Sequence, residues 1–141
     1  YFSFTQKILK GEAIEVYGDG KMARDFTYID DIVESIVRIQ DVLPVKDKFD
    51  MSSPDKSSAP YRVYNIGNGA PVSLARFIEA IESSAGKKAI KKFLPMQPGD
   101  VYTTHADTDE LVNAIGYRPV VSIEEGMQRF VRWYSDFYGK H

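Results

Sequence analysis

The fold class of this sequence is decided by the stretch Arg24-Asp25-Phe26-Thr27-Tyr28-Ile29-Asp30-Asp31-Ile32-Val33. Its first half is rich in aromatic and β-branched residues and predicts a strand over residues 24–29. Asp30 and Asp31 then place negative charge where a helix begins. One apolar stripe follows at helical spacing, formed by Ile32, Val33, Ile36, Val37 and Ile39. A short strand followed directly by a helix indicates α/β construction.

The segments before this stretch continue the same alternation. An amphipathic pattern predicts a helix over residues 1–10, which Gly11 ends. Apolar and polar residues alternate over 14–17 as in a strand, and Gly18-Asp19-Gly20 predicts a turn. Because no capping residue precedes the first helical pattern, we expect the chain to begin inside a larger protein.

The segments after it add further strands and helices. The helix that starts at Asp30 should end near Leu43, before a long exposed loop over 44–60. A strand is predicted over 62–67, a helix from Ser73 to Gly86, and a lysine-protected edge strand around 89–90. Capping boxes predict the last two helices and pair Asp107 with Glu110 and Ser122 with Glu125.

The composition limits the classes of function. The chain has 141 residues, no cysteine and two histidines, and its 18 Lys+Arg and 20 Asp+Glu give a net charge of −2. We therefore expect one compact unit, without a thiolate metal site, a cysteine nucleophile or a surface for nucleic acid. No apolar run approaches the length that spans a bilayer, so we expect a soluble, cytoplasmic protein without membrane attachment.

Two short motifs match catalytic or cofactor patterns only in their letters. Residues 18–23, Gly-Asp-Gly-Lys-Met-Ala, satisfy the glycine pattern of dinucleotide-binding loops, but a strand rather than a helix is predicted after them. Tyr17 and Lys21 satisfy Tyr-x-x-x-Lys, yet Gly18 and Gly20 make a helix there unfavourable. We interpret residues 17–23 as a hairpin turn without a cofactor or catalytic role.

Four segments together resemble the C-terminal half of the NAD-dependent epimerase/dehydratase family. They are Arg24-Asp25-Phe26-Thr27-Tyr28-Ile29-Asp30-Asp31, Tyr64-Asn65-Ile66-Gly67-Asn68-Gly69, Pro98-Gly99-Asp100 with Ala106-Asp107, and Ile115-Gly116-Tyr117-Arg118-Pro119 with Ile123-Glu124-Glu125-Gly126 and Trp133-Tyr134. Within the family, 26–33 and 96–101 are most similar to UDP-glucuronate 4-epimerases. Gln97 departs from the Arg that many UDP-galactose 4-epimerases have at this place.

The resemblance implies a fold and an activity for the parent protein. Residues 1–141 would form the C-terminal nucleotide-sugar-binding region of an extended short-chain dehydrogenase/reductase, without most of its Rossmann domain. The parent would interconvert UDP-glucuronate and UDP-galacturonate by NAD-dependent oxidation and re-reduction at C4. Since the proton-transfer pair and the cofactor loop are not identifiable, the isolated chain is expected to be inactive and to bind no NAD.

The resemblance also assigns substrate-binding residues. Arg24 would bridge phosphate oxygens or a sugar carboxylate, Glu15 and Tyr17 would lie along the uracil, Gln97 and Asp100 would approach the phosphates and ribose, and Thr104 would face the sugar. A guanidinium fork suits oxyanions. For Arg24 the alternative is a salt bridge to Asp25 or another acid. No residue is assigned to catalysis or to a metal, and His105 is expected to be structural.

Other readings of the sequence stay open. The parent could be another dehydratase, reductase or decarboxylase of the same family, and the chain could be a non-catalytic nucleotide-sugar-binding module or a remnant that binds nothing. The expected partners are a UDP-sugar and the missing N-terminal Rossmann half. Without that half, exposed apolar surface should promote self-association, for example by exchange of the helix over residues 1–9.

Overall fold

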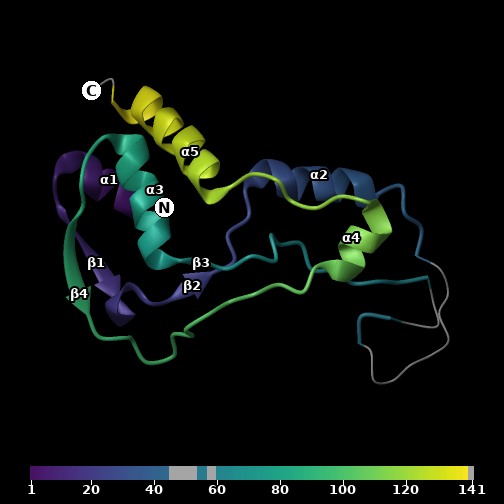
Figure 1. The fold of residues 1–141 in the computed structure, drawn as a ribbon. Helices are drawn as coiled ribbons and strands as arrows, with labels where there is room; N and C mark the ends of the chain where they lie inside the picture. The colour runs from purple at the N-terminus through teal and green to yellow at the C-terminus, as the bar shows by residue number, and fades with distance from the viewer. Residues whose placement is uncertain (45–53, 57–59, 140–141) are drawn as a thin grey trace.

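The computed structural model describes residues 1–44, 54–56 and 60–139, which form an elongated α/β molecule with two groups of elements (Figure 1). One end holds helices α1, α3 and α5 with strands β1 and β4, and the other holds α2 and α4. The elements in chain order are α1 (Phe2–Lys10), β1 (Ala13–Tyr17), η1 (Gly18–Gly20), β2 (Ala23–Arg24), α2 (Ile29–Ile39), β3 (Val72–Ser73), α3 (Leu74–Ala85), β4 (Ile90–Leu94), α4 (Asp109–Ile115) and α5 (Ile123–Tyr138).

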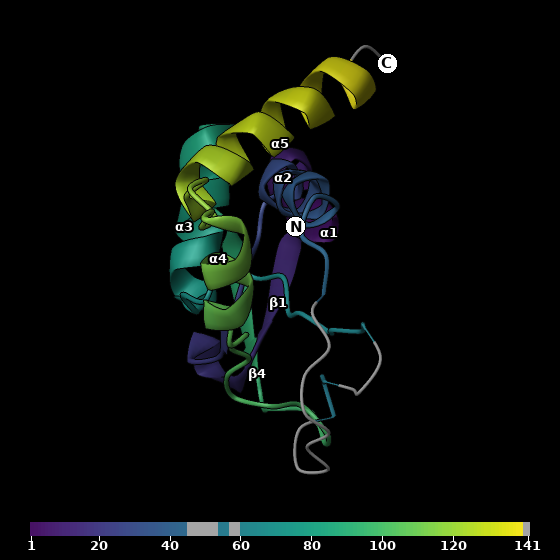
Figure 2. The same ribbon diagram turned by 90° about the vertical axis from the view of Figure 1, so that its right-hand side faces the viewer.

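The hydrophobic core lies at the first of these ends. Strand β1 pairs in parallel with β4, from Ala13 opposite Ile90 to Tyr17 opposite Leu94. Figure 2 shows the two strands side by side, with α3 along one side and α5 above. The buried cluster takes Ile8 from α1, Ile14 and Val16 from β1, Phe77, Ile78 and Ile81 from α3, and Met127 and Val131 from α5.

The helix signals of the sequence are mostly confirmed. Ser73 and Ser122 cap α3 and α5, and each hydroxyl accepts a backbone N–H three residues later at 3.2 Å. Gly11, Gly86 and Gly116 adopt the left-handed conformation at the ends of α1, α3 and α4. The capping box at Asp107 is wrong, because α4 begins at Asp109, whose N–H donates to the Asp107 carboxylate at 3.3 Å.

Two predicted strands are corrected. Of residues 24–29, only Arg24 lies in a strand, the two-residue β2 that pairs with β3, and α2 already begins at Ile29. Residues 62–67 form no regular strand, since only Arg62 makes an isolated bridge, to Lys56. Within these segments the N–H of Asp25 donates to the hydroxyl of Thr104 at 3.2 Å, and the N–H of Val63 donates to the carbonyl of Asp55 at 3.0 Å. Most of the predicted loop over 44–60 lies outside the described residues.

Helix α2 is oriented opposite to the expectation from its apolar stripe. It ends at Ile39 rather than near Leu43, since the N–H groups of Asp41 and Val42 bond three residues back and tighten its last turn. Its buried side is polar, with Asp31 and Ser35 each 1% exposed. Val33, Ile36 and Val37 of the predicted stripe are 49%, 44% and 54% exposed.

The Asp31 carboxylate explains why this polar side is buried. It accepts hydrogen bonds from the Tyr117 hydroxyl at 2.5 Å and from the N–H groups of Val120 and Val121 at 3.2 and 3.1 Å. These bonds attach the connection between α4 and α5 to α2. Asp31 raises the pKa of Tyr117 to about 12, chiefly because its carboxylate accepts the phenolic proton's hydrogen bond.

None of the helices in the described residues combines the length and the apolar character needed to cross a membrane.

The aromatic residues of α5 are only partly in the core. Tyr134 is 7% exposed, whereas Trp133 and Phe137 are 48% and 62% exposed, so these two rings are only partly covered by the described part of the chain.

A buried carboxylate connects the end of α3 to β4. Glu82, with a side chain 3% exposed, contacts the ammonium groups of Lys88 at 2.7 Å and Lys91 at 3.0 Å. It also accepts the N–H of Ala89 at 3.1 Å. Burial alone would raise the pKa of Glu82, but the bonds from Lys88, Lys91 and Ala89 outweigh it and lower the pKa to about 2 from 4.5.

Stability should therefore depend on pH through Glu82. The folded pKa lies below the unfolded value, so the stabilisation is complete above pH 4.5 and is lost as the pH falls toward about 2. The difference corresponds to roughly 3 kcal/mol. Urea unfolding at pH 6 and pH 3 should show a smaller pH dependence for Glu82→Gln than for the native chain. The matched control, Glu79→Gln on the exposed side of the same helix, should keep it, and an unchanged pH dependence in Glu82→Gln would contradict the assignment.

Candidate functional site

A pocket of about 250 Å³ lies where β1, β2 and the start of α3 meet. Three of its lining residues are polar, namely Glu15, Tyr17 and Arg24. The others are apolar, namely Phe4, Met22, Phe26, Val72 and Leu74. A cation beside an apolar wall suits a ligand with an anionic part and a flat ring.

The alternation along β1 places the first two polar residues. Ile14 and Val16 are 0% and 1% exposed and face the core, so Glu15 and Tyr17 lie on the opposite face. The Tyr17 hydroxyl donates a hydrogen bond to the Glu15 carboxylate at 3.0 Å. This bond raises the pKa of Tyr17, and the nearby charge of Asp100 adds to the increase.

Arg24 presents its guanidinium to the pocket without a carboxylate partner among the described residues. Its Nη1 donates to the carbonyl oxygens of Ala23 at 2.8 Å and Tyr102 at 3.4 Å. Its Nη2 lies 3.8 Å from the sulfur of Met22. The salt bridge to Asp25 is absent from the described structure, because the Asp25 carboxylate accepts backbone N–H groups instead. The positive charge is thus held in place, and no carboxylate of the described residues neutralises it.

The other predicted residues lie along the irregular segment after β4. Asp100 forms a turn in which its N–H donates to the carbonyl of Gln97 at 3.2 Å, and both side chains are exposed. Thr104 runs beside β2, where its N–H donates to the carbonyl of Ala23 at 3.3 Å. His105 makes a 3.1 Å bond to the carbonyl of Gly69. The structure brings Glu15, Tyr17 and Arg24 into one pocket and leaves Gln97, Asp100 and Thr104 outside its lining.

The turn over residues 18–23 does not fit a dinucleotide. Gly18, Asp19 and Gly20 have φ of 58°, 54° and 74°, which interrupts any helix at this point. Strand β2 follows instead of a helix whose first N–H groups could face a pyrophosphate. Tyr17 and Lys21 are likewise not on one helical face. The described residues also contain no group of three or more acidic or histidine side chains that could hold a metal ion.

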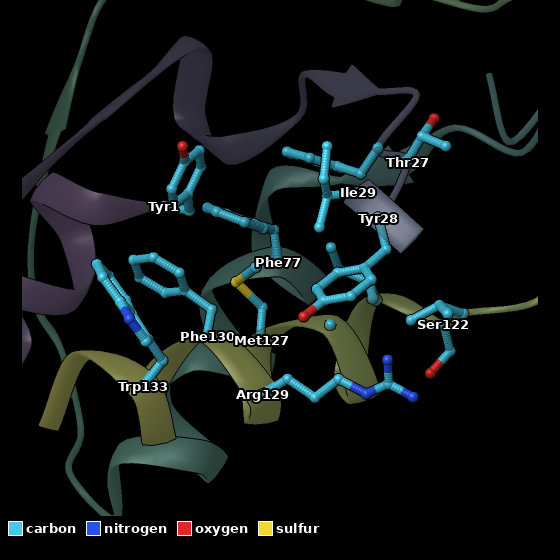
Figure 3. Close-up of a pocket in the computed structure, with 14 residues that line it drawn as sticks. Tyr1, Thr27, Tyr28, Ile29, Phe77, Ser122, Met127, Arg129, Phe130 and Trp133 are labelled. Atoms are coloured by element: carbon cyan, nitrogen blue, oxygen red, sulfur yellow. The ribbon is translucent and has the colours of Figure 1, made fainter. Parts of the chain in front are cut away.

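A larger pocket of about 470 Å³ shares Phe26 with the smaller pocket as a lining residue. Figure 3 shows Tyr1, Phe130 and Trp133 at one side of it and Tyr28 and Arg129 at the other. Its cation is already paired, because Arg129 contacts Asp30 at 2.9 Å and Glu125 at 2.5 Å. This pocket is mainly apolar, so the smaller pocket beside Arg24 is the better candidate for an anionic ligand.

Several contributors to the site were not predicted from the sequence. Phe4 comes from α1, Val72 from β3 and Leu74 from the start of α3. Phe26 stacks on Phe77 with centroids 4.7 Å apart and planes 5° apart. The pairing of β2 with β3 sets Val72 opposite Arg24, and the two-residue length of both strands leaves no sequence pattern that could reveal this pairing.

Comparison with known proteins relates the chain to nucleotide-sugar enzymes. A family model described as "NAD dependent epimerase/dehydratase family" matches residues 1–67. The "Uncharacterized 37.6 kDa protein in cld 5'region" of Escherichia coli O111:H- is 51% identical over 140 residues, covering 97% of this chain and 42% of that protein. The "Probable UDP-glucuronate 4-epimerase" of Rhizobium meliloti (strain 1021) is 47% identical over 143 residues, covering 97% of this chain and 41% of that relative.

A solved structure supports the same relationship. The crystal structure of UDP-glucuronic acid 4-epimerase from Bacillus cereus, in complex with UDP-glucuronic acid and NAD, has a TM-score of 0.76 and 27% identity to this chain. The match covers 96% of this chain and 39% of that structure. The chain therefore spans less than half of the length of each of these proteins.

The geometry of residues 18–23 predicts that the isolated chain does not bind NAD. Three successive positive φ values and the strand that follows leave no helix terminus for the pyrophosphate. Isothermal titration calorimetry with NAD should show no saturable heat, while the far-ultraviolet circular dichroism of the same sample confirms that it is folded. A micromolar affinity would overturn our interpretation of this turn.

Proposed function

We propose that this chain, which belongs to the NAD dependent epimerase/dehydratase family, binds the UDP-sugar in a nucleotide-sugar 4-epimerase. Its fold corresponds to the C-terminal, substrate-binding part of extended short-chain dehydrogenases/reductases. The parent would interconvert UDP-glucuronate and UDP-galacturonate by NAD-dependent oxidation and re-reduction at C4. Relatives named as UDP-glucuronate 4-epimerases support this substrate pair.

The observation that carries the proposal is the unneutralised Arg24 beside an apolar wall. A nucleoside diphosphate offers phosphate oxygens to a guanidinium fork and a flat base to apolar side chains. Arg24 is held by carbonyl oxygens and a sulfur, which leave its charge available. Glu15 and Tyr17 project from β1 beside it. We assign the diphosphate to Arg24 and the uracil to the strand that carries Glu15 and Tyr17.

The remaining predicted contacts belong to the same proposal. Asp100 would approach the ribose, and Gln97, whose carbonyl accepts the Asp100 N–H in the same turn, would approach the phosphates. Thr104 would face the sugar. Glutamine supplies hydrogen bonds without a positive charge, so Arg24 would carry most of the electrostatic attraction to the diphosphate. Residues 97–104 are largely exposed, so the ligand itself would have to cover them.

The chemistry would reside outside these 141 residues. Residues 1–141 would act as one nucleotide-sugar-binding region, while the rest of the parent would supply the NAD site and the proton-transfer groups. The proposal therefore gives the isolated chain no epimerase activity. A cytoplasmic location of the parent remains a prediction.

The first test replaces the cation. In the full-length parent, Arg24→Ala should weaken binding of UDP-glucuronate by about 1.5 to 3 kcal/mol, the range for hydrogen bonds to a charged group. NAD affinity should not change, because the proposal places the cofactor site in the rest of the parent. Calorimetry with each ligand in turn measures both affinities.

A matched control tests whether the loss of binding is specific to Arg24 or follows from the removal of any arginine. Arg118, whose side chain is 56% exposed and pairs with Asp109 at 3.3 Å, lies away from the pocket. Arg118→Ala should bind UDP-glucuronate as the native protein does. If Arg24→Ala and Arg118→Ala bind UDP-glucuronate with the same affinity, and circular dichroism shows that both are folded, Arg24 does not bind the ligand and has only a structural role.

The exposed side of α2 supports the proposal that the chain packs against the rest of its parent. Val33, Ile36 and Val37 form this side, and each is more than 40% exposed. Burial of such side chains is favourable, each contributing up to about 1.5 to 3 kcal/mol. We place the contact here rather than at α1, whose Ile8 is 1% exposed and already packed in the core.

The isolated chain should therefore self-associate. Sedimentation velocity over a concentration series should show a rising average mass, and Val33→Glu with Val37→Glu should suppress the rise. The control pair, Glu34→Gln with Arg38→Gln, changes exposed positions of the same helix without removing apolar surface. A monomer at every concentration, with low binding of an apolar dye, would contradict this prediction and favour a free-standing module.

A further inference from the structure

Asp25 connects three segments that are distant in the sequence. Its Oδ2 accepts hydrogen bonds from the N–H of Gly69 at 3.1 Å and from the N–H of Ala106 at 3.0 Å. Its own N–H donates to the hydroxyl of Thr104 at 3.2 Å. One residue thus holds the segment after β2, the loop before β3 and the segment before α4 together.

The packing around this carboxylate is close. A Cβ on Gly67 would lie 2.6 Å from the Cβ of Ala106 and 3.2 Å from Oδ2 of Asp25. Real Cβ atoms do not approach so closely, so the two loops meet where both residues are small. Oδ1 of Asp25 is buried and accepts no hydrogen bond from the described residues. The hydrogen bonds by which the Asp25 side chain joins the two loops are therefore made by Oδ2 alone.

The same segments hold the guanidinium of Arg24. The N–H of Ala23 donates to the carbonyl of Tyr102 at 2.8 Å, and the N–H of Thr104 donates to the carbonyl of Ala23 at 3.3 Å. Arg24 Nη1 donates to these same two carbonyls, of Ala23 and Tyr102. Asp25 fixes the path of residues 104–106 relative to β2, and hence the distance between the carbonyl groups that orient Arg24.

We propose that Asp25 is a positioning residue that sets the orientation of Arg24 toward the diphosphate of the ligand. It does so by joining the loops at Gly69 and Ala106 to β2, without touching the ligand itself. This inference rests on the proposed function of Arg24. A cation that is displaced by an ångström loses much of its interaction with a phosphate, since hydrogen bonds weaken steeply with geometry.

The test is a double-mutant cycle in the full-length parent, with UDP as the probe. Asp25→Ala should weaken UDP binding by about tenfold or more, as Arg24→Ala does. In the Arg24→Ala background, Asp25→Ala should have almost no further effect on UDP affinity, because the group that it positions is gone. NAD affinity and thermal unfolding, measured on the same samples, report any general damage.

Asp25→Asn keeps the inference testable if the alanine variant does not fold. Its amide oxygen can still accept both N–H groups, and Oδ1, which the amide nitrogen replaces, accepts nothing from the described residues. This variant should bind UDP within about threefold of the native protein. The matched control is Asp109→Ala, which removes an exposed carboxylate beside Arg118 and should leave UDP affinity unchanged.

The outcomes separate the two proposals. If neither Arg24→Ala nor Asp25→Ala changes UDP affinity, the proposed function of the pocket fails. If Arg24→Ala weakens binding but Asp25→Ala does not, only the positioning role fails. Equal losses from Asp25→Ala in the native and Arg24→Ala backgrounds would likewise overturn it, because additive effects mean that Asp25 does not act through Arg24.

Discussion

The carboxylates of Asp25 and Asp31 accept backbone N–H groups from segments that have almost no regular pairing. A buried N–H without an acceptor costs about 1–3 kcal/mol, so an irregular chain can pack only where side chains provide acceptors. Asp25 does this for the loops beside the pocket, and Asp31 does it for the connection that leads into α5. The loops that hold Arg24, the proposed phosphate-binding residue, depend on Asp25, and the attachment of α2 depends on Asp31.

This dependence explains which elements could be predicted from the sequence. The helices α1, α3 and α5 and the strand β1 follow from local signals, namely apolar spacing, serine caps and terminal glycines. The strands expected over 24–29 and 62–67 were wrong, because the partners of these segments lie far away. Asp25 accepts hydrogen bonds from Gly69 and Ala106, which follow it by 44 and 81 positions in the sequence. A local sequence pattern cannot predict contacts over such separations. The stripe of α2 indicated a helix correctly, but periodicity cannot show which side is covered.

The candidate site could be predicted only in part, because local patterns place some of its residues and long-range contacts place the others. Alternation along β1 places Glu15 and Tyr17 on one face, and the family resemblance adds Arg24, which the structure brings to the same pocket. The resemblance alone could not place Gln97 and Thr104, since they follow an irregular path outside the pocket lining. Asp25 was considered only as an ionic partner of Arg24. Small residues at positions 67, 69 and 106 were the available sign of close backbone approach around it.

The close approach at Gly67 has a consequence for sequence divergence. Two other glycines, Gly11 and Gly86, have positive φ but open space around them, and asparagine adopts that conformation at modest cost. Gly67 has no such freedom, because any side chain would press on Ala106 and Asp25 at once. Relatives that retain this arrangement should therefore vary at the helix ends and keep glycine at position 67, and a change there should appear only together with changes at positions 25 and 106.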